Sequence, residues 1–141
     1  MKNFELRDSS GVVFAYVSKE KDQPWLYIRW VGDIKTEELK HVMLQYIDVL
    51  KDNKYSYVLS DRRQSTGNVF EINHFIEHKW SSMAVDAGLQ CVANVTAPEV
   101  TSSKFTSTDL ASRIIGFEFK SFDSIEEAEE WLTQKAVQAQ H

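Results

Sequence analysis

The sequence contains only one cysteine, Cys91, among its 141 residues. A lone cysteine cannot form an internal disulfide, so an oxidising compartment has no support and we expect a cytoplasmic protein. Long hydrophobic runs are also missing, because no stretch approaches the length of a membrane-spanning helix and the charged first eight residues lack the apolar core of an export signal. We therefore expect no membrane insertion.

A basic surplus is missing as well. The formal net charge is -5 and the sequence pI is about 5.4. Binding to nucleic acid needs a basic surface that releases counterions, so a general affinity for nucleic acid is not expected. The sequence also lacks a glycine-rich phosphate loop, a glycine-framed nucleophile and a Ser-His-Asp set at recognisable spacing. These absences lead us to expect no cofactor and no enzymatic activity.

The residues that are present predict one folded domain spanning residues 1–141, with fraying after about residue 135. Runs of β-branched and aromatic residues predict five strands, at 12–17, 25–31, 55–60, 89–95 and 117–122. Apolar periodicity and capping residues predict about four helices, at 36–50, 68–88, 103–115 and from Ser124 onward. The order is therefore β-β-α-β-α-β-α-β-α. Because every strand after the first hairpin follows a helix, this order predicts a mixed α/β fold with a mostly parallel five-stranded sheet and an antiparallel first strand.

Three short motifs accompany this order of elements. They are Trp30-Val31-Gly32, Leu59-Ser60-Asp61-Arg62-Arg63, and Glu127-Ala128 with Trp131-Leu132. With them, the chain resembles the SpoIIAA-like family, whose members are small bacterial domains related to STAS regulatory modules and, more distantly, to Sec14-type lipid-binding domains. The resemblance implies a non-catalytic regulatory or protein-interaction module. The alternative that it leaves open is a small-molecule or lipid-binding domain of Sec14 character.

The candidate binding site is a polar loop after the third predicted strand, with Asp61, Arg62, Arg63, Ser65 and Thr66. The predicted topology places this loop at the carboxyl end of a parallel strand and at the amino end of a helix, where α/β sheets bind ligands and anions. In STAS antagonists the corresponding loop carries an Asp-Ser pair whose serine is phosphorylated, and that pair is missing here. The alternative is that the charges form surface ion pairs and the other residues turn the chain.

Alanine at both arginines is expected to weaken partner or anion binding more than alanine at Ser65 and Thr66, because electrostatic attraction would dominate this loop. Either change should alter stability by less than about 1 kcal/mol, as at most exposed positions.

A short metal motif, H-x-x-E-H, spans residues 74–78. Zinc enzymes use this spacing, but helical periodicity directs His74 and His78 away from the apolar stripe of their helix. We therefore interpret the motif as a solvated helix face and expect no metal. Cys91 alternates with Leu89, Ala93 and Val95, which is typical of a small core residue in a strand.

Aromatic residues support two further expectations. A cavity between sheet and helices, as in the Sec14 alternative, could be lined by six rings: Tyr27, Tyr46, Tyr55, Tyr57, Phe70 and Phe75. A chain of this length, however, needs most of its rings to fill its core. A hairpin strand at the edge of the sheet leaves backbone groups unpaired, which favours a homodimer.

Overall fold

The computed structural model describes residues 4–19, 24–33, 36–53, 56–66, 79–95 and 116–139. These residues form six strands and three helices. In chain order they are β1 (Phe4–Arg7), β2 (Val13–Ser18), β3 (Leu26–Asp33), α1 (Thr36–Asn53), β4 (Tyr57–Thr66), α3 (Ser81–Asp86), β5 (Cys91–Val95), β6 (Glu118–Phe122) and α6 (Ile125–Ala139).

One mixed sheet contains all six strands, in the order β1-β2-β3-β4-β5-β6. The pairs β1/β2 and β2/β3 are antiparallel, whereas β3, β4, β5 and β6 are parallel to one another. This confirms the mixed, mostly parallel α/β sheet predicted from the order of elements. Two neighbouring parallel strands must be connected by a segment that crosses from one end of the sheet to the other. The strands from β3 to β6 are therefore widely separated along the chain.

The prediction of five strands was wrong, because the N-terminal segment Phe4–Arg7 forms a sixth strand. Its Leu6 is buried while Glu5 and Arg7 on either side are exposed. One buried residue between two exposed ones is too short an alternation to identify an edge strand from the sequence. Of the four predicted helices, the one at 103–115 lies outside the described residues, and the one at 68–88 is described only from residue 79, where it includes α3.

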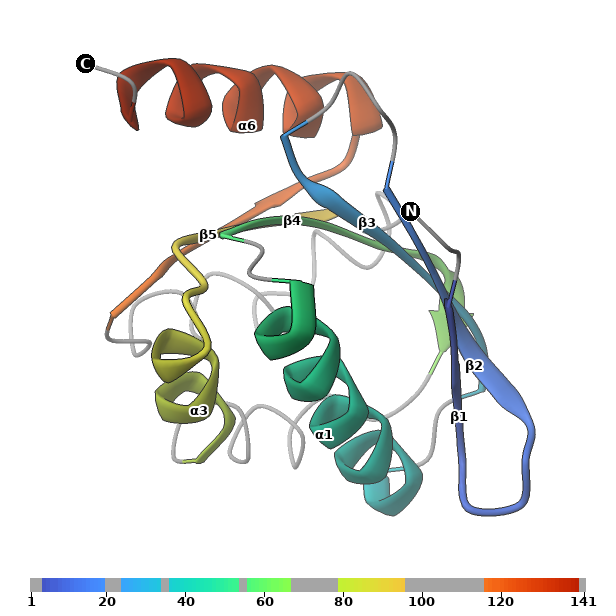
Figure 1. Ribbon diagram of the computed structural model, residues 1–141. Coiled ribbons are helices and arrows are strands. Elements are labelled where there is room, and N and C mark those ends of the chain that lie inside the picture. The colour runs from blue at the N-terminus through green and yellow to red at the C-terminus, as the bar shows by residue number, and fades with distance from the viewer. Residues whose placement is uncertain are drawn as a thin grey trace.

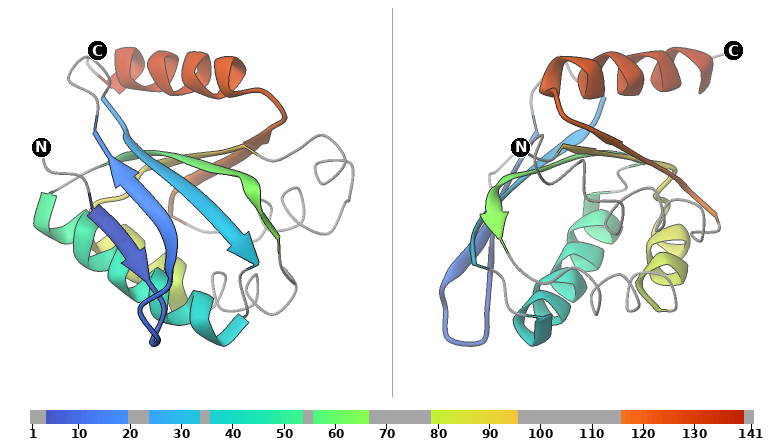
Figure 2. Two further views of the ribbon diagram at one scale, coloured as in Figure 1. Left: turned by 90° about the vertical axis from the view of Figure 1, so that its right-hand side faces the viewer. Right: turned by 180° about the vertical axis from the view of Figure 1, so that it is seen from behind.

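The helices pack on opposite faces of the sheet. Helices α1 and α3 lie on one face, and α6 lies on the other (Figure 1). The views from the side and from behind show the same three layers (Figure 2). The α1 face buries Leu26, Ile28, Trp30, Leu50 and Val58 among others, and the α6 face buries Trp25, Leu59, Ala93, Val95, Ala128 and Leu132.

The last helix begins as the sequence predicts. The Ser124 hydroxyl accepts a hydrogen bond from the Glu127 amide at 3.4 Å and donates one to Glu126 Oε2 at 2.8 Å. Two acids, Glu126 and Glu127, lie in the first turn, where they complement the positive end of the helix. The helix continues to Ala139, past residue 135, after which we expected fraying. None of the described helices is long and apolar enough to cross a membrane.

The free edge of β1 is partly covered by a side chain from α1. The Gln45 amide donates from Nε2 to the carbonyl oxygen of Arg7 at 2.7 Å, and its Oε1 accepts from the Arg7 amide at 3.3 Å. Gln45 thus occupies both backbone groups that an added strand would use at Arg7. Edge strands are commonly protected in such ways against pairing with another chain.

Homodimerisation, which stays a prediction, can be tested at this edge. We expect Gln45→Ala to self-associate more strongly than the wild type, because the change uncovers the Arg7 amide and carbonyl. Light scattering at about 50 µM would detect an interface of micromolar affinity. Asp48→Ala, at an exposed position on the same helix, is the control. Equal masses for all three proteins would show that Gln45 does not protect this edge.

Candidate functional site

The predicted site residues 61–66 lie in β4 and not in a loop, so that part of the prediction was wrong. Strand β4 continues to Thr66 because it pairs in parallel with β3, in which Gly32 lies opposite Ser65 and Asp33 opposite Thr66. The register shifts between Arg29 and Val31, so that two residues of β4 face one of β3. Such a bulge re-aims side chains locally, and it occurs here at Arg62 and Arg63.

The bulge distinguishes the two adjacent arginines. Arg63 binds Asp61 through two side-chain contacts, Nε to Oδ1 at 2.9 Å and Nη2 to Oδ2 at 2.7 Å. The backbone amide of Arg63 also donates to Asp61 Oδ1, at 3.1 Å. Arg62 is partly buried and does not take part in this pair, and burial lowers the pKa of its guanidinium. Of these two adjacent arginines, Arg63 is the one whose guanidinium Asp61 holds at the sheet surface.

Asp61 is the buried centre of this cluster. Its side chain is 3% exposed, whereas that of Arg63 is 41% exposed. Tyr27 on β3 donates its hydroxyl to Asp61 Oδ2 at 2.6 Å. Burial alone would raise the pKa of Asp61, but the hydrogen bonds from Arg63 and Tyr27 and the charge of Arg63 outweigh it and leave that pKa below its usual value. Burial and the bond to Asp61 raise the pKa of Tyr27 to about 12.

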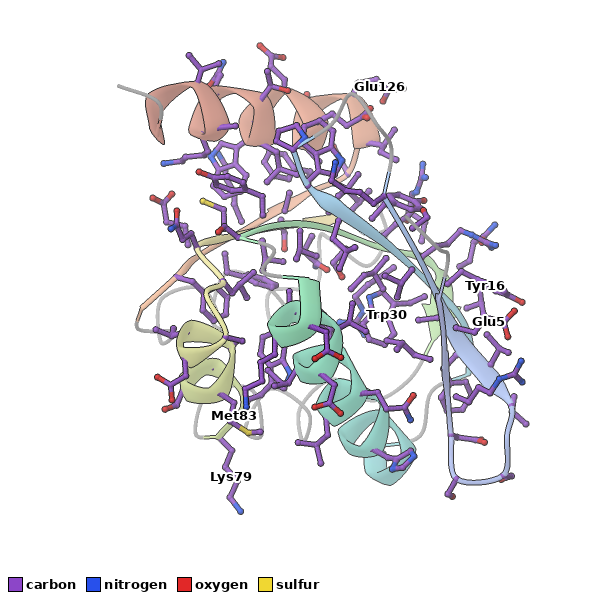
Figure 3. All side chains as sticks on the ribbon, in the orientation of Figure 1. Glu5, Tyr16, Trp30, Lys79, Met83 and Glu126 are labelled. Atoms are coloured by element: carbon purple, nitrogen blue, oxygen red, sulfur yellow. The ribbon has the colours of Figure 1, made fainter. Side chains whose placement is uncertain are left out.

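A second guanidinium lies beside this cluster on the same face of the sheet. The backbone of Arg29 lies opposite that of Asp61 in the register of β3 and β4. The side chain of Arg29 donates from Nη1 to Gln64 Oε1 at 2.8 Å. Its Cζ lies 4.7 Å from the centre of the Tyr16 ring on β2, within the range of a cation–π contact. Tyr16 and Glu5 extend from the outer side of the sheet, while Trp30 points toward α1 (Figure 3).

Our sequence reasoning did not place Tyr16, Arg29 and Gln64 at a site. A signal for part of this arrangement is present in β3, where Leu26, Ile28 and Trp30 alternate with Tyr27 and Arg29. Alternation of period two places Tyr27 and Arg29 together on the face opposite the apolar residues. Their contacts with β2 and β4 depend on the register in which these strands pair with β3. The alternation within β3 does not predict that register.

A hollow of about 670 Å³ lies over β1, β2 and β3, on the part of the sheet that α6 leaves uncovered. Arg7, Tyr16, Tyr27 and Arg29 are among the residues that line it. Arg7 is paired there with Glu5, and its Nη1 donates to the carbonyl oxygen of Gly11 at 2.7 Å. The hollow adjoins the cluster of Tyr27, Asp61 and Arg63, because Tyr27 both lines the hollow and donates to Asp61.

Several predictions fall on positions that the structure does not describe. The side chains of Ser65 and Thr66, and the whole H-x-x-E-H segment with His74 and His78, lie outside the described residues. In the part of the chain that is described, no three His, Cys, Asp or Glu side chains group closely enough to hold a metal ion.

Cys91 is a core residue, which confirms its sequence interpretation. It is 5% exposed and lies in the cluster beneath α6. Burial, with a smaller contribution from the charge of Glu118, raises the pKa of its thiol to about 11. A thiol with such a pKa is protonated at neutral pH and is a poor nucleophile.

Three comparisons with known proteins bear on the family. A crystal structure of an uncharacterized protein with a SpoIIAA-like fold, from Shewanella loihica PV-4, aligns with a TM-score of 0.54 and 17% identity, covering 84% of this chain and 91% of that one. This likeness shows the fold alone. No curated protein matches the sequence. The model of the SpoIIAA-like family matches residues 25–133, from the start of β3 into α6. The chain therefore belongs to the SpoIIAA-like family.

Proposed function

We propose that this protein is a regulatory or protein-interaction module that acts by binding a partner and not by catalysis. The observation that carries the proposal is the Arg63 guanidinium, which Asp61 holds in a fixed orientation at the sheet surface. A guanidinium immobilised in this way loses little further side-chain entropy when it binds. Arginine and tyrosine side chains are also frequent among the residues that dominate binding energy in protein interfaces.

The electrostatics of the cluster favour binding over proton transfer. A general acid or base works best with a pKa near the working pH. The pKa of Asp61 lies below its usual value and that of Tyr27 is about 12, so neither group changes its protonation near neutral pH. The cluster is suited to holding Arg63 in place, and we expect the partner to present an acidic group to it.

Affinity purification from the native host tests the proposal. We expect Arg62→Ala/Arg63→Ala to reduce recovery of a stoichiometric partner by about tenfold or more, and Ser65→Ala/Thr66→Ala to reduce it less, because a fixed cation contributes more than neutral hydroxyls. Circular dichroism of each variant should show that it is folded. Recovery of no stoichiometric partner under several growth conditions would contradict the interaction module. The reverse order of the two variants would instead assign recognition to the hydroxyls.

A second candidate is a small-molecule or lipid-binding domain of Sec14 character, and one buried group favours it. Tyr46 is 3% exposed, and its hydroxyl has no hydrogen-bond partner among the described residues. Its ring packs 5.0 Å from that of Trp80 and 6.3 Å from that of Trp30, on the α1 face of the sheet. A buried polar atom without a partner is costly, and a ligand with an acceptor atom would satisfy it.

Native mass spectrometry separates the two candidates. A co-purifying lipid or metabolite would favour the second, whereas a ligand-free mass together with no thermal shift across a lipid panel would retire it.

A further inference from the structure

We propose that the hollow over β1, β2 and β3 is the docking site for an acidic side chain of a partner protein, with Arg29 as the anchoring cation. This inference rests on the proposed function, because it names the chemistry that a partner would bring to that surface. Tyr27 connects the two parts of the surface, since it lines the hollow and donates to the Asp61 that holds Arg63.

The arginines that the structure describes on this face, Arg7, Arg29 and Arg63, differ in their partners. Arg7 is paired with Glu5, and Arg63 is paired with Asp61. Arg29 has only neutral partners, the side-chain oxygen of Gln64 and the ring of Tyr16, and no carboxylate contacts it among the described residues. Within the described part of the chain, the guanidinium of Arg29 thus has no carboxylate in contact with it, and it lies at the wall of a hollow. A carboxylate is the complementary group.

The arrangement leaves Arg29 able to bind such a group. An arginine side chain has five N–H donors. The hydrogen bond from Arg29 to Gln64, at 2.8 Å, involves only the nitrogen Nη1. The contact with Tyr16 is a cation–π contact, with Cζ 4.7 Å from the ring centre, and it places no second oxygen acceptor on the guanidinium. Gln64 and Tyr16 together restrict the movement of Arg29, which prepares it for a carboxylate that approaches through the hollow.

The shape of the hollow favours a protein partner over a small molecule. Its lining residues come only from β1, β2 and β3, so the sheet forms a floor, while α6 packs over β4, β5 and β6. Sites for small molecules usually enclose most of the ligand surface, which a floor without an opposing wall does not do. The body of a partner protein would supply that wall. A polyanionic nucleic acid is disfavoured by the net charge of -5.

Carboxylate recognition can be tested directly by NMR with a defined probe. The probe is a blocked dipeptide of aspartate and phenylalanine, and the same dipeptide with asparagine is its uncharged control. We expect saturable shifts at Arg29 Nε and at the amides of Tyr16 and Tyr27, with the asparagine dipeptide binding at least about fivefold more weakly than the aspartate dipeptide. Arg29→Gln should abolish the difference between the two dipeptides, and Arg29→Lys should restore part of it. Equal binding of both dipeptides to the wild type, or an unchanged difference in Arg29→Gln, would overturn the proposal.

Partner recovery then tests the docking itself. We expect Arg29→Gln to reduce recovery of the partner by about tenfold, and the matched control Arg7→Gln, in the same hollow but already paired with Glu5, to reduce it much less. Thermal unfolding should show that both variants are folded. A partner recovered equally by wild type and Arg29→Gln would overturn this inference and leave the proposed function intact. Recovery of no partner by any of these proteins would overturn both.

Discussion

Replacing Leu132 with alanine is expected to lower the free energy of unfolding by about 3 kcal/mol, as is usual when a fully buried leucine is truncated. Leu132 is 0% exposed and packs with Trp25, Leu59 and Ala93 between α6 and the sheet. Helix α6 contacts β4, β5 and β6, so the cavity left by the truncation would lie beneath it. The loss would combine the missing transfer free energy of the removed atoms with the cost of that cavity.

Urea unfolding followed by circular dichroism measures this effect. Val137→Ala is the matched control on the same helix, because Val137 is 49% exposed and its truncation should change stability by less than about 0.5 kcal/mol. Similar losses for the two variants would contradict the packing of α6 through Leu132. A smaller slope of the unfolding transition in Leu132→Ala, with little change at its midpoint, would point instead to a change in the unfolded state.

Replacing Arg63 with alanine is expected to cost about 2 kcal/mol, because it leaves the carboxylate of Asp61 buried without its cation. Arg63 is half-exposed, so its pairing energy is partly screened by solvent and the loss lies below the range for fully buried pairs. For alanine at both Arg62 and Arg63, the sequence led us to expect a change of less than about 1 kcal/mol, as at most exposed positions. The structure changes that expectation, since the partner of Arg63 is 3% exposed.

A second change in the Arg63→Ala background separates charge from packing. Asp61→Asn removes the buried negative charge and keeps an oxygen that accepts the Tyr27 hydroxyl, so the double variant should regain part of the lost stability. If Arg63→Ala and the double variant are equally unstable, the charge of Asp61 is not the cause. The cycle is measured by the same urea titrations.

The pH dependence of stability provides a further measurement on the same pair. The pKa of Asp61 is lowered in the folded protein, so its contribution is fully present above the pKa of the unfolded state. This contribution is lost as the pH falls from about 3.9, the pKa of an aspartate in an unfolded chain, through the lower pKa that Asp61 has in the folded protein. Asp61→Asn should therefore lose less stability than the wild type in this range. Parallel curves for the two proteins would show that Asp61 is not stabilised as a carboxylate.

Elements with long patterns were predicted well from the sequence. Helix α1 was predicted from apolar spacing, and the described members of its stripe, Tyr46, Ile47 and Leu50, are buried. The start of α6 was predicted from Ser124 and Glu127, and the Ser124 hydroxyl does bind the Glu127 amide. Such patterns are local, since a helix repeats its contacts every three or four residues along the chain. The order of these elements was enough to predict the mixed sheet, and together with three short motifs it gave the resemblance to the family.

The candidate site was predicted in part. The sequence identified Asp61, Arg62 and Arg63 as a polar group after an apolar strand, and the alternative that they form ion pairs was considered. The structure shows an ion pair between Asp61 and Arg63, at 2.7 Å, but Asp61 is 3% exposed, so the pair is not the surface pair that the alternative described. The segment was wrongly predicted to be a loop, because polar residues are typical of loops and the pairing of β4 with Gly32 and Asp33 of β3 is not visible in either segment alone.

The sequence by itself determined the α/β class, helices α1 and α6, the membership of the strands in a mostly parallel sheet, and the burial of Cys91. Each of these depends on the periodicity or chemistry of neighbouring residues. Only the tertiary structure decided which of two adjacent arginines binds Asp61, and that Tyr16, Arg29 and Gln64, from three different strands, come into contact. Those contacts depend on the register between strands and on the bulge in β4, and register is set by pairing between segments that are distant in sequence.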